Sequence, residues 1–182
     1  MADQFIMLLR HAEKPDGKGL VIGVTQDGFQ NDEGLTIRGW ERAGALAAWF
    51  SAPPSPLQRP AVIFASGQIK KDNSGSRSLR PIQTVTPLAE KLALPIDTRF
   101  TKGEEAELAK ALSGMTGRIL VSWQHENIPA IVKGLTGGTP AGFDNWPDKH
   151  FDMVWVAQRP SPSGQWTLTK VFQNLLPGDL AG

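Results

Sequence analysis

The chain has 182 residues, a length that suits one domain with its own hydrophobic core. Its formal net charge is +1, so bulk charge favours neither nucleic acid nor an acidic membrane as a partner. It has no cysteine, which excludes disulfides, thiolate metal sites and a cysteine nucleophile. It shows no secretion signal and no apolar run near the roughly 18 residues that cross a bilayer. We therefore expect one cytoplasmic domain over residues 1–182.

The first predicted element is a strand at residues 5–9. This run is apolar at every position, which suits a strand buried on both faces of a parallel sheet. Residues 14–35 are rich in Gly, Asp, Asn and Lys and predict a long loop, and such loops are often functional. Apolar residues then recur at three-four spacing over residues 37–50, which predicts a helix capped by Thr36.

A second apolar run at residues 61–65 predicts another buried strand. Residues 66–78, which include Lys70 and Lys71, show no periodicity and predict a surface loop. A helix follows at residues 79–92, with a proline in its first turn, where no hydrogen bond is lost. Residues 94–99 then predict a short strand.

The second half of the chain continues the alternation. Residues 104–112 predict a helix with acidic residues in its first turn, and residues 119–123 predict a third buried strand. A helix at residues 128–135 ends at two glycines. Strands at residues 151–157 and 166–172 form a predicted hairpin. This order indicates the α/β class with a mostly parallel central sheet.

Polar side chains follow or open these elements at three places. Arg10 and His11 come directly after the first strand, Arg80 opens the second long helix, and His125 and Glu126 follow the third strand. In an open α/β sheet the carboxyl ends of the strands face one crevice, where ligands bind. We therefore expect these side chains to meet although they lie far apart in the sequence.

These residue types suit phosphoryl transfer. Arginine is always charged and binds a phosphate with two parallel hydrogen bonds. A neutral imidazole is a competent nucleophile near pH 7 and forms covalent intermediates. The reaction needs a nucleophile in line and positive charge around the equatorial oxygens, and a protonated second histidine supplies such charge. No metal-binding cluster is evident, and this chemistry needs neither a metal nor a cofactor.

Four motifs resemble the histidine phosphatase superfamily, whose members are phosphoglycerate-mutase-like. Leu-Leu-Arg-His-Ala-Glu at residues 8–13 resembles the Arg-His-Gly signature, with alanine in place of glycine. Residues 35–43 resemble Leu-Thr-x-x-Gly-x-x-Gln-Ala, and residues 78–84 resemble Ser-x-x-Arg-Ala-x-Gln-Thr. Residues 123–128 stand where that family has its second histidine. Each motif alone is weak, but together, in this order, they make a strong match.

The resemblance implies a three-layer α/β/α sandwich and a particular set of roles. His11 would be the phosphohistidine nucleophile, and Arg10, Arg80 and His125 would form the phosphate pocket. The implied function is a metal-independent phosphoric monoester hydrolase. Its substrate would be a phosphorylated small molecule or a phosphoprotein, and inorganic phosphate would be its product.

The proton donor for the leaving group is the open part of this interpretation. Mutase-like members use a glutamate after a central strand, and residues 96–100 offer none there. The acid-phosphatase branch uses the acidic residue just after the second histidine, which here is Glu126. We favour Glu126, with Glu104 or Glu105 as alternatives. His150 has no motif partner and is expected at a loop or strand edge.

Two alternative functions remain beside the phosphomonoesterase. A phosphohistidine phosphatase that acts on a protein can manage without a proton donor, because imidazole leaves easily. A phosphate-binding pseudoenzyme would keep the pocket without turnover. The chain is shorter than the phosphoglycerate mutases and shows no extra lid, which favours hydrolysis over mutase activity. The sequence does not name the substrate, because one fold serves many.

Overall fold

A computed structural model of the chain describes residues 3–69, 73, 75–161 and 163–180. The six-stranded sheet has the order β3-β2-β4-β1-β5-β6. Its strands are β1 (Gln4–Arg10), β2 (Val62–Ala65), β3 (Ile96–Asp97), β4 (Gly117–Trp123), β5 (Met153–Arg159) and β6 (Thr167–Phe172). The helices are α1 (Ile37–Ser51), α2 (Arg80–Leu92), α3 (Glu105–Ser113) and α4 (Ile128–Thr136), with a 3-10 turn η1 (His125–Asn127).

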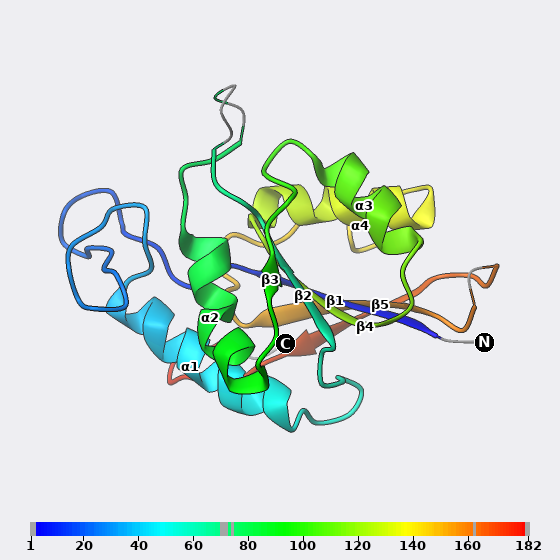
Figure 1. Cartoon of the computed structure of the whole chain (residues 1–182), viewed down its shortest axis with the longest axis horizontal. Helices are drawn as coiled ribbons and strands as arrows, with labels where there is room; N and C mark the ends of the chain where they lie inside the picture. Colours follow the sequence, from blue (N-terminus) through cyan, green and yellow to red (C-terminus); the bar gives the residue numbers. More distant parts are fainter. Residues whose placement is uncertain (1–2, 70–72, 74, 162, 181–182) are drawn as a thin grey trace.

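The sheet is mostly parallel, as the sequence predicts. β3, β2, β4 and β1 run parallel to one another, while β5 is antiparallel to β1 and forms the predicted hairpin with β6. α1 and α2 cover one face of the sheet, and α3 and α4 cover the other (Figure 1). This arrangement is a three-layer α/β/α sandwich, so the expected fold class is confirmed.

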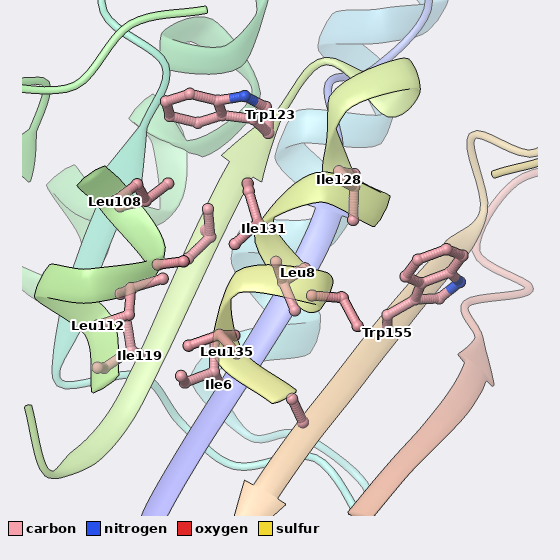
Figure 2. Close-up of a cluster of buried hydrophobic side chains, with 14 of the residues drawn as sticks. Ile6, Leu8, Leu108, Leu112, Ile119, Trp123, Ile128, Ile131, Leu135 and Trp155 are labelled. Atoms are coloured by element: carbon pink, nitrogen blue, oxygen red, sulfur yellow. The ribbon is translucent and has the colours of Figure 1, made fainter. Parts of the chain in front are cut away.

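The burial of β1 on both faces of the sheet explains why its apolar run contains no polar residue. Phe5, Met7 and Leu9 point into the core under α1 and α2, whereas Ile6 and Leu8 point into the core under α3 and α4. Successive side chains of a strand face opposite sides of the sheet, so a strand covered on both faces must be apolar throughout. Figure 2 shows the second core, with side chains from α3, α4 and the neighbouring strands packed on β1.

Two details differ from the sequence prediction. The strand expected at residues 94–99 shortens to Ile96–Asp97, because the Asp97 carboxylate accepts hydrogen bonds from the Arg99 backbone N–H and guanidinium and turns the chain there. The turn η1, which carries His125, was not anticipated. Lys70 and Lys71 of the predicted surface loop lie outside the described residues. Of the described helices, none combines the length and apolarity that a membrane span requires.

The register of the sheet brings three strand ends to one edge. Arg10 of β1 lies opposite Trp123 of β4, and Ala65 of β2 lies opposite Ser122. The backbone N–H of His11 continues this ladder by donating to the Trp123 carbonyl at 3.0 Å. The residues that follow β1, β2 and β4 therefore emerge side by side, which positions the candidate site.

Candidate active site

His11 is held in the tautomer that a nucleophile needs. Its Nδ1 lies 2.8 Å from the Ala12 carbonyl oxygen. A carbonyl only accepts hydrogen bonds, so Nδ1 carries the proton and the lone pair is on Nε2. The side chain is 4% exposed, and this burial lowers its pKa to about 3, assisted by the charges of Arg10, Arg80 and His125. His11 is therefore a neutral imidazole at neutral pH.

Two helices fix the segment that carries this histidine. The backbone N–H of Ala12 donates to Thr84 Oγ1 of α2 at 2.8 Å. Thr36, the predicted cap of α1, accepts from Gly39 N at 3.1 Å and donates its own N–H to the Glu13 carbonyl at 3.0 Å. A Cβ on Gly39 would stand 2.6 Å from the Glu13 carbonyl oxygen. The glycine of the second motif therefore allows α1 to approach the segment that carries His11 closely.

Arg10 provides a buried cation beside His11. Its guanidinium stacks on the Phe151 ring at 3.7 Å, and its Nη1 donates to the Asp148 carbonyl oxygen. Its Nε is buried and has no hydrogen-bond partner among the described residues. Burial lowers the pKa of Arg10 to about 10, although the negative charges of Asp148, Glu126 and Glu13 raise it. The group stays charged at neutral pH and keeps a donor available for an anion.

His125 lies between two carboxylates. Its Nε2 is 2.9 Å from Asp148 Oδ1, and its Nδ1 is 3.0 Å from Glu126 Oε2 in a geometry that makes no hydrogen bond. Burial lowers the pKa of His125, and Arg10 adds to this effect, while Asp148 and Glu126 oppose it. Nδ1 is buried, and Nε2 is the ring nitrogen that makes a hydrogen bond, to Asp148.

Arg80 reaches toward the long loop after β1. Its Nε donates to the Gly34 carbonyl at 3.2 Å and its Nη2 to the Asp32 carbonyl at 3.1 Å, and Glu33 lies 3.7 Å away. Burial lowers the pKa of Arg80, and Glu33 opposes this shift. Its charge is close enough to act on His11. The loop thus holds the guanidinium near His11.

A cavity of about 680 Å³ adjoins Arg80. Cations, carboxylates and apolar side chains of the long loop share its walls, so its lining is chemically mixed. The lining residues are Lys14, Pro15, Asp16, Gly17, Gly19, Val21, Ile22, Gln30, Asp32 and Arg80.

Glu126, the favoured proton donor, is ion-paired in this structure. Lys102 Nζ lies 2.7 Å from Glu126 Oε1. Burial alone would raise the pKa of Glu126, but the hydrogen bond from Lys102 and the nearby His125 bring it down to about 2. A carboxyl group in this state is ionised at neutral pH and has no proton to give.

The two alternative donors hold the start of α3 together. Glu105 is buried, and its Oε1 accepts from Trp123 Nε1 and from the Gly103 backbone N–H, both at 3.0 Å. Glu104 Oε2 accepts from the Thr101 backbone N–H at 2.9 Å. Both carboxylates are thus engaged in local structure.

Sequence reasoning missed the segment at residues 146–152. It follows no buried strand and matches no family motif, yet Asp148 touches both Arg10 and His125, and Phe151 lies under the Arg10 guanidinium. The available signal was a run of polar and aromatic residues around His150. That histidine lies at the edge of β5, as expected, and its Nδ1 is 3.0 Å from Asp152 Oδ1.

Arg42 is a second residue whose role the sequence did not reveal. It stands where the resembling motif has glutamine, and it is 2% exposed. Its guanidinium binds the Glu13 carboxylate, Asp179 Oδ1 at 2.6 Å and Gln173 Oε1 at 3.1 Å. Burial lowers the pKa of Arg42, but the two carboxylates outweigh it and raise this pKa above its ordinary value. The C-terminal segment is thereby fastened to the residues next to His11.

Comparison with protein-family models and with curated proteins finds no match. Solved structures, in contrast, match over almost the whole chain. A mycobacterial hydrolase has a TM-score of 0.57 and 14% identity over 96% of this chain and 100% of its own. A mycobacterial glucosyl-3-phosphoglycerate phosphatase has a TM-score of 0.52 and 17% identity, covering 94% and 99%.

A phosphoserine phosphatase from Entamoeba histolytica, in complex with 3-phosphoglyceric acid, also matches. Its TM-score is 0.58 at 14% identity, covering 94% of this chain and 99% of that one. Identities this low show a shared fold, and they leave the chemistry to be argued from the residues.

Proposed function

The chain has the fold of the histidine phosphatase superfamily, and we propose that it is a phosphomonoesterase whose His11 takes the phosphoryl group. One observation carries the proposal. A buried neutral imidazole has its Nδ1 tied to the Ala12 carbonyl, so that Nε2 keeps its lone pair beside the cations of Arg10 and Arg80. This is the state in which a histidine is nucleophilic.

The proposed reaction has two steps. His11 Nε2 bonds to phosphorus while the bond to the leaving oxygen breaks, and that oxygen takes up a proton. Water then attacks the phosphohistidine and releases inorganic phosphate. Arg10 and Arg80 stabilise the negative charge on the equatorial oxygens, and the Ala12 carbonyl keeps the ring oriented through both steps.

His125 and Glu126 would have different roles in the proposed reaction. His125 would contribute a hydrogen bond through Nε2, and positive charge when protonated, to the phosphoryl group. Glu126 is the carboxyl group that the family resemblance suggests as proton donor. It would have to leave Lys102 before it could carry a proton.

The cavity beside Arg80 supports a phosphorylated small molecule as substrate. Its volume of about 680 Å³ lies within the range of sites that bind small molecules, and it far exceeds what a phosphoryl group fills. Two of the similar structures hold 3-phosphoglyceric acid and phosphoserine. Lys14 in the cavity wall makes no hydrogen bond or ion pair among the described residues and would suit an anionic group on the leaving side.

A phosphoprotein substrate is the second candidate. Leu20 and Phe29 of the long loop are 85% and 72% exposed, and large exposed apolar side chains beside a site favour a protein partner. Hydrolysis of small phosphate esters far more slowly than of a phosphorylated peptide would favour this candidate.

The test is hydrolysis of an aryl phosphate by the wild type and by His11→Ala, with and without a chelator. We expect activity that survives the chelator and falls by about three orders of magnitude or more in the variant, because the nucleophile is gone. Acid-stable trapping cannot be used, since phosphohistidine is acid-labile, so the phosphoenzyme is trapped in alkali. Lys110→Gln, on the exposed side of α3, serves as a control because it lies away from the segment that carries His11.

Each other result has a definite meaning. Tight binding of vanadate without turnover of any ester would indicate a phosphate-binding protein rather than an enzyme. Equal activity in wild type and His11→Ala would remove the phosphohistidine mechanism.

A further inference from the structure

Asp148 is held over the site by its neighbours in the chain. Trp146 is 1% exposed and packs on Trp155 with ring centroids 4.9 Å apart. Phe151 lies under Arg10, and Asp152 is 2% exposed and accepts the Leu180 backbone N–H. The backbone is therefore fixed on both sides of Asp148, while the Asp148 side chain itself is 91% exposed.

The Asp148 carboxylate contacts the Nε2 side of the His125 ring. Nδ1 of that ring is buried, and Nε2 is 2.9 Å from Asp148 Oδ1. The Asp148 carbonyl accepts from Arg10 at the same time. One residue thus contacts both groups that would surround a bound phosphoryl group, and its carboxylate stays open to solvent and to a leaving group.

Four other carboxylates near the site have partners of their own. Glu126 Oε1 is paired with Lys102 while its Oε2 lies 3.0 Å from the buried Nδ1 of His125 without a hydrogen bond, and Glu13 is bound by the buried guanidinium of Arg42. Glu104 and Glu105 accept hydrogen bonds at the start of α3. Among the described residues, Asp148 is the carboxylate that hydrogen-bonds a titratable side chain of the phosphate pocket.

We propose that Asp148 is a further catalytic residue, which with His125 forms the pair that supplies the leaving-group proton. This rests on the proposed phosphatase function. In the reactive form His125 is protonated on both ring nitrogens, and its Nε2–H donates to Asp148 Oδ1 across the 2.9 Å contact, so that the carboxylate stabilises the proton to be transferred. The pair would act as the general acid, a role for which the sequence analysis named only Glu126, Glu104 and Glu105.

The proton balance closes over the two steps. As the phosphorus–oxygen bond breaks and phosphorus bonds to His11 Nε2, the pair passes its proton to the leaving oxygen and the alcohol departs. The pair is left as neutral imidazole and carboxylate. Water then attacks the phosphohistidine, gives one proton back to the pair, and phosphate leaves as the nitrogen–phosphorus bond breaks.

The experiment compares two esters that differ in their need for a proton. The alkoxide of an alkyl phosphate is a poor leaving group that needs a proton. The phenolate of an aryl phosphate leaves readily without one. We expect Asp148→Asn to lower kcat/KM by about 100-fold on the alkyl ester and by less than about fivefold on the aryl ester. Asp148→Glu, which keeps a carboxyl group, should recover part of the alkyl activity.

Two parallel variants make the result specific. Asp144→Asn removes an exposed carboxylate of the same loop that has no hydrogen bond or ion pair among the described residues, and both activities should stay within about twofold of wild type. Glu126→Gln should lower the activity on both esters by the same factor or leave both activities unchanged. A selective alkyl loss in Glu126→Gln, with none in Asp148→Asn, would return the role to Glu126.

Other outcomes also decide the matter. An equal loss on both esters in Asp148→Asn would mean that Asp148 only positions His125. Higher activity on both would mean that its carboxylate merely competes with substrate. Failure of the phosphatase function itself would be visible in the wild type, which would then hydrolyse neither ester or would be unaffected by His11→Ala.

Discussion

At the scale of single residues, His11 and Glu126 show that burial and partners decide what an ionisable group can do. His11 is buried and has no carboxylate partner in the part of the chain that the structure describes, so its pKa falls to about 3 and it is neutral at neutral pH. Glu126 is paired with Lys102, so its pKa falls to about 2 and it is an anion. The sequence identified both residues, but their protonation states depend on neighbours that only the fold brings close.

The buried neutral state of His11 predicts an acid-dependent loss of stability. In the unfolded chain this histidine would titrate near 6.5, whereas in the folded protein it titrates near 3. Between these values the unfolded state binds the extra proton, so stability falls as pH is lowered through that window, by up to about 1.4 kcal/mol per pH unit. Denaturant unfolding at several pH values should give a flatter profile for His11→Asn. Parallel profiles for the two proteins would contradict a depressed pKa.

The ion pair of Glu126 makes a second prediction at this scale. Lys102→Gln removes the cation that holds this carboxylate ionised, so the pKa of Glu126 should rise from about 2 toward its ordinary value of 4.5. A carbon NMR titration of the Glu126 carboxyl group measures this directly. Lys110→Gln, on the exposed side of α3, should leave that titration where it is.

At the scale of elements, the packing of α1 onto the segment that carries His11 depends on one glycine. Gly39→Ala would place a Cβ 2.6 Å from the Glu13 carbonyl oxygen, which is backbone and cannot rotate away. We expect a loss of about 1–3 kcal/mol in unfolding free energy and a lower kcat, because the segment that orients His11 shifts. Gly44 of the same helix has open space at its Cβ position, so Gly44→Ala should instead stabilise by about 0.5–1 kcal/mol. Equal effects from both changes would refute the close-approach argument.

The elements themselves could be predicted because their signals are local. The apolar run of β1, the three-four spacing of α1 and the proline that opens α2 each indicate an element without knowledge of the rest of the chain. Arg10, His11, Arg80 and His125 were predictable for a related reason, since they follow strands or open a helix at the same edge of the sheet. The short β3 was overestimated because the hydrogen bonds of Asp97 to Arg99 end it.

The parts that could not be predicted depend on contacts between distant segments. Nothing near Asp148 in the sequence indicates that it meets His125, and nothing near Arg42 indicates that it binds Asp179. These pairings form only when β5 and the C-terminal segment dock on β1 and α1. Local patterns carry no information about such docking, and the family resemblance ends before residue 146.

At the scale of the whole molecule, the cluster of Arg42, Glu13 and Asp179 ties the end of the chain to the site near its beginning. Asp179→Asn should cost about 3 kcal/mol of stability, because it leaves a buried guanidinium short of one counter-charge. Since the pKa of Asp179 is lowered to about 2, chiefly by Arg42 against the effect of burial, its contribution should decline as pH falls from about 3.8 and be lost below about 2. Denaturant unfolding measures both effects, and the exposed Glu41→Gln in α1 is the control. An unchanged midpoint would show that the tail is not held by this cluster.

The position of β1 in the sheet has a consequence for how the protein is made. Of the six strands, β1 is synthesised before the others, yet its two partners are β4 and β5, which follow more than one hundred residues later. Until they emerge, an apolar strand with both edges open is exposed during synthesis, a condition that favours aggregation. The nascent chain must therefore keep this strand shielded by chaperones or by transient collapse. Stretches of rare codons before β4 would lengthen that exposure and lower the yield of folded protein.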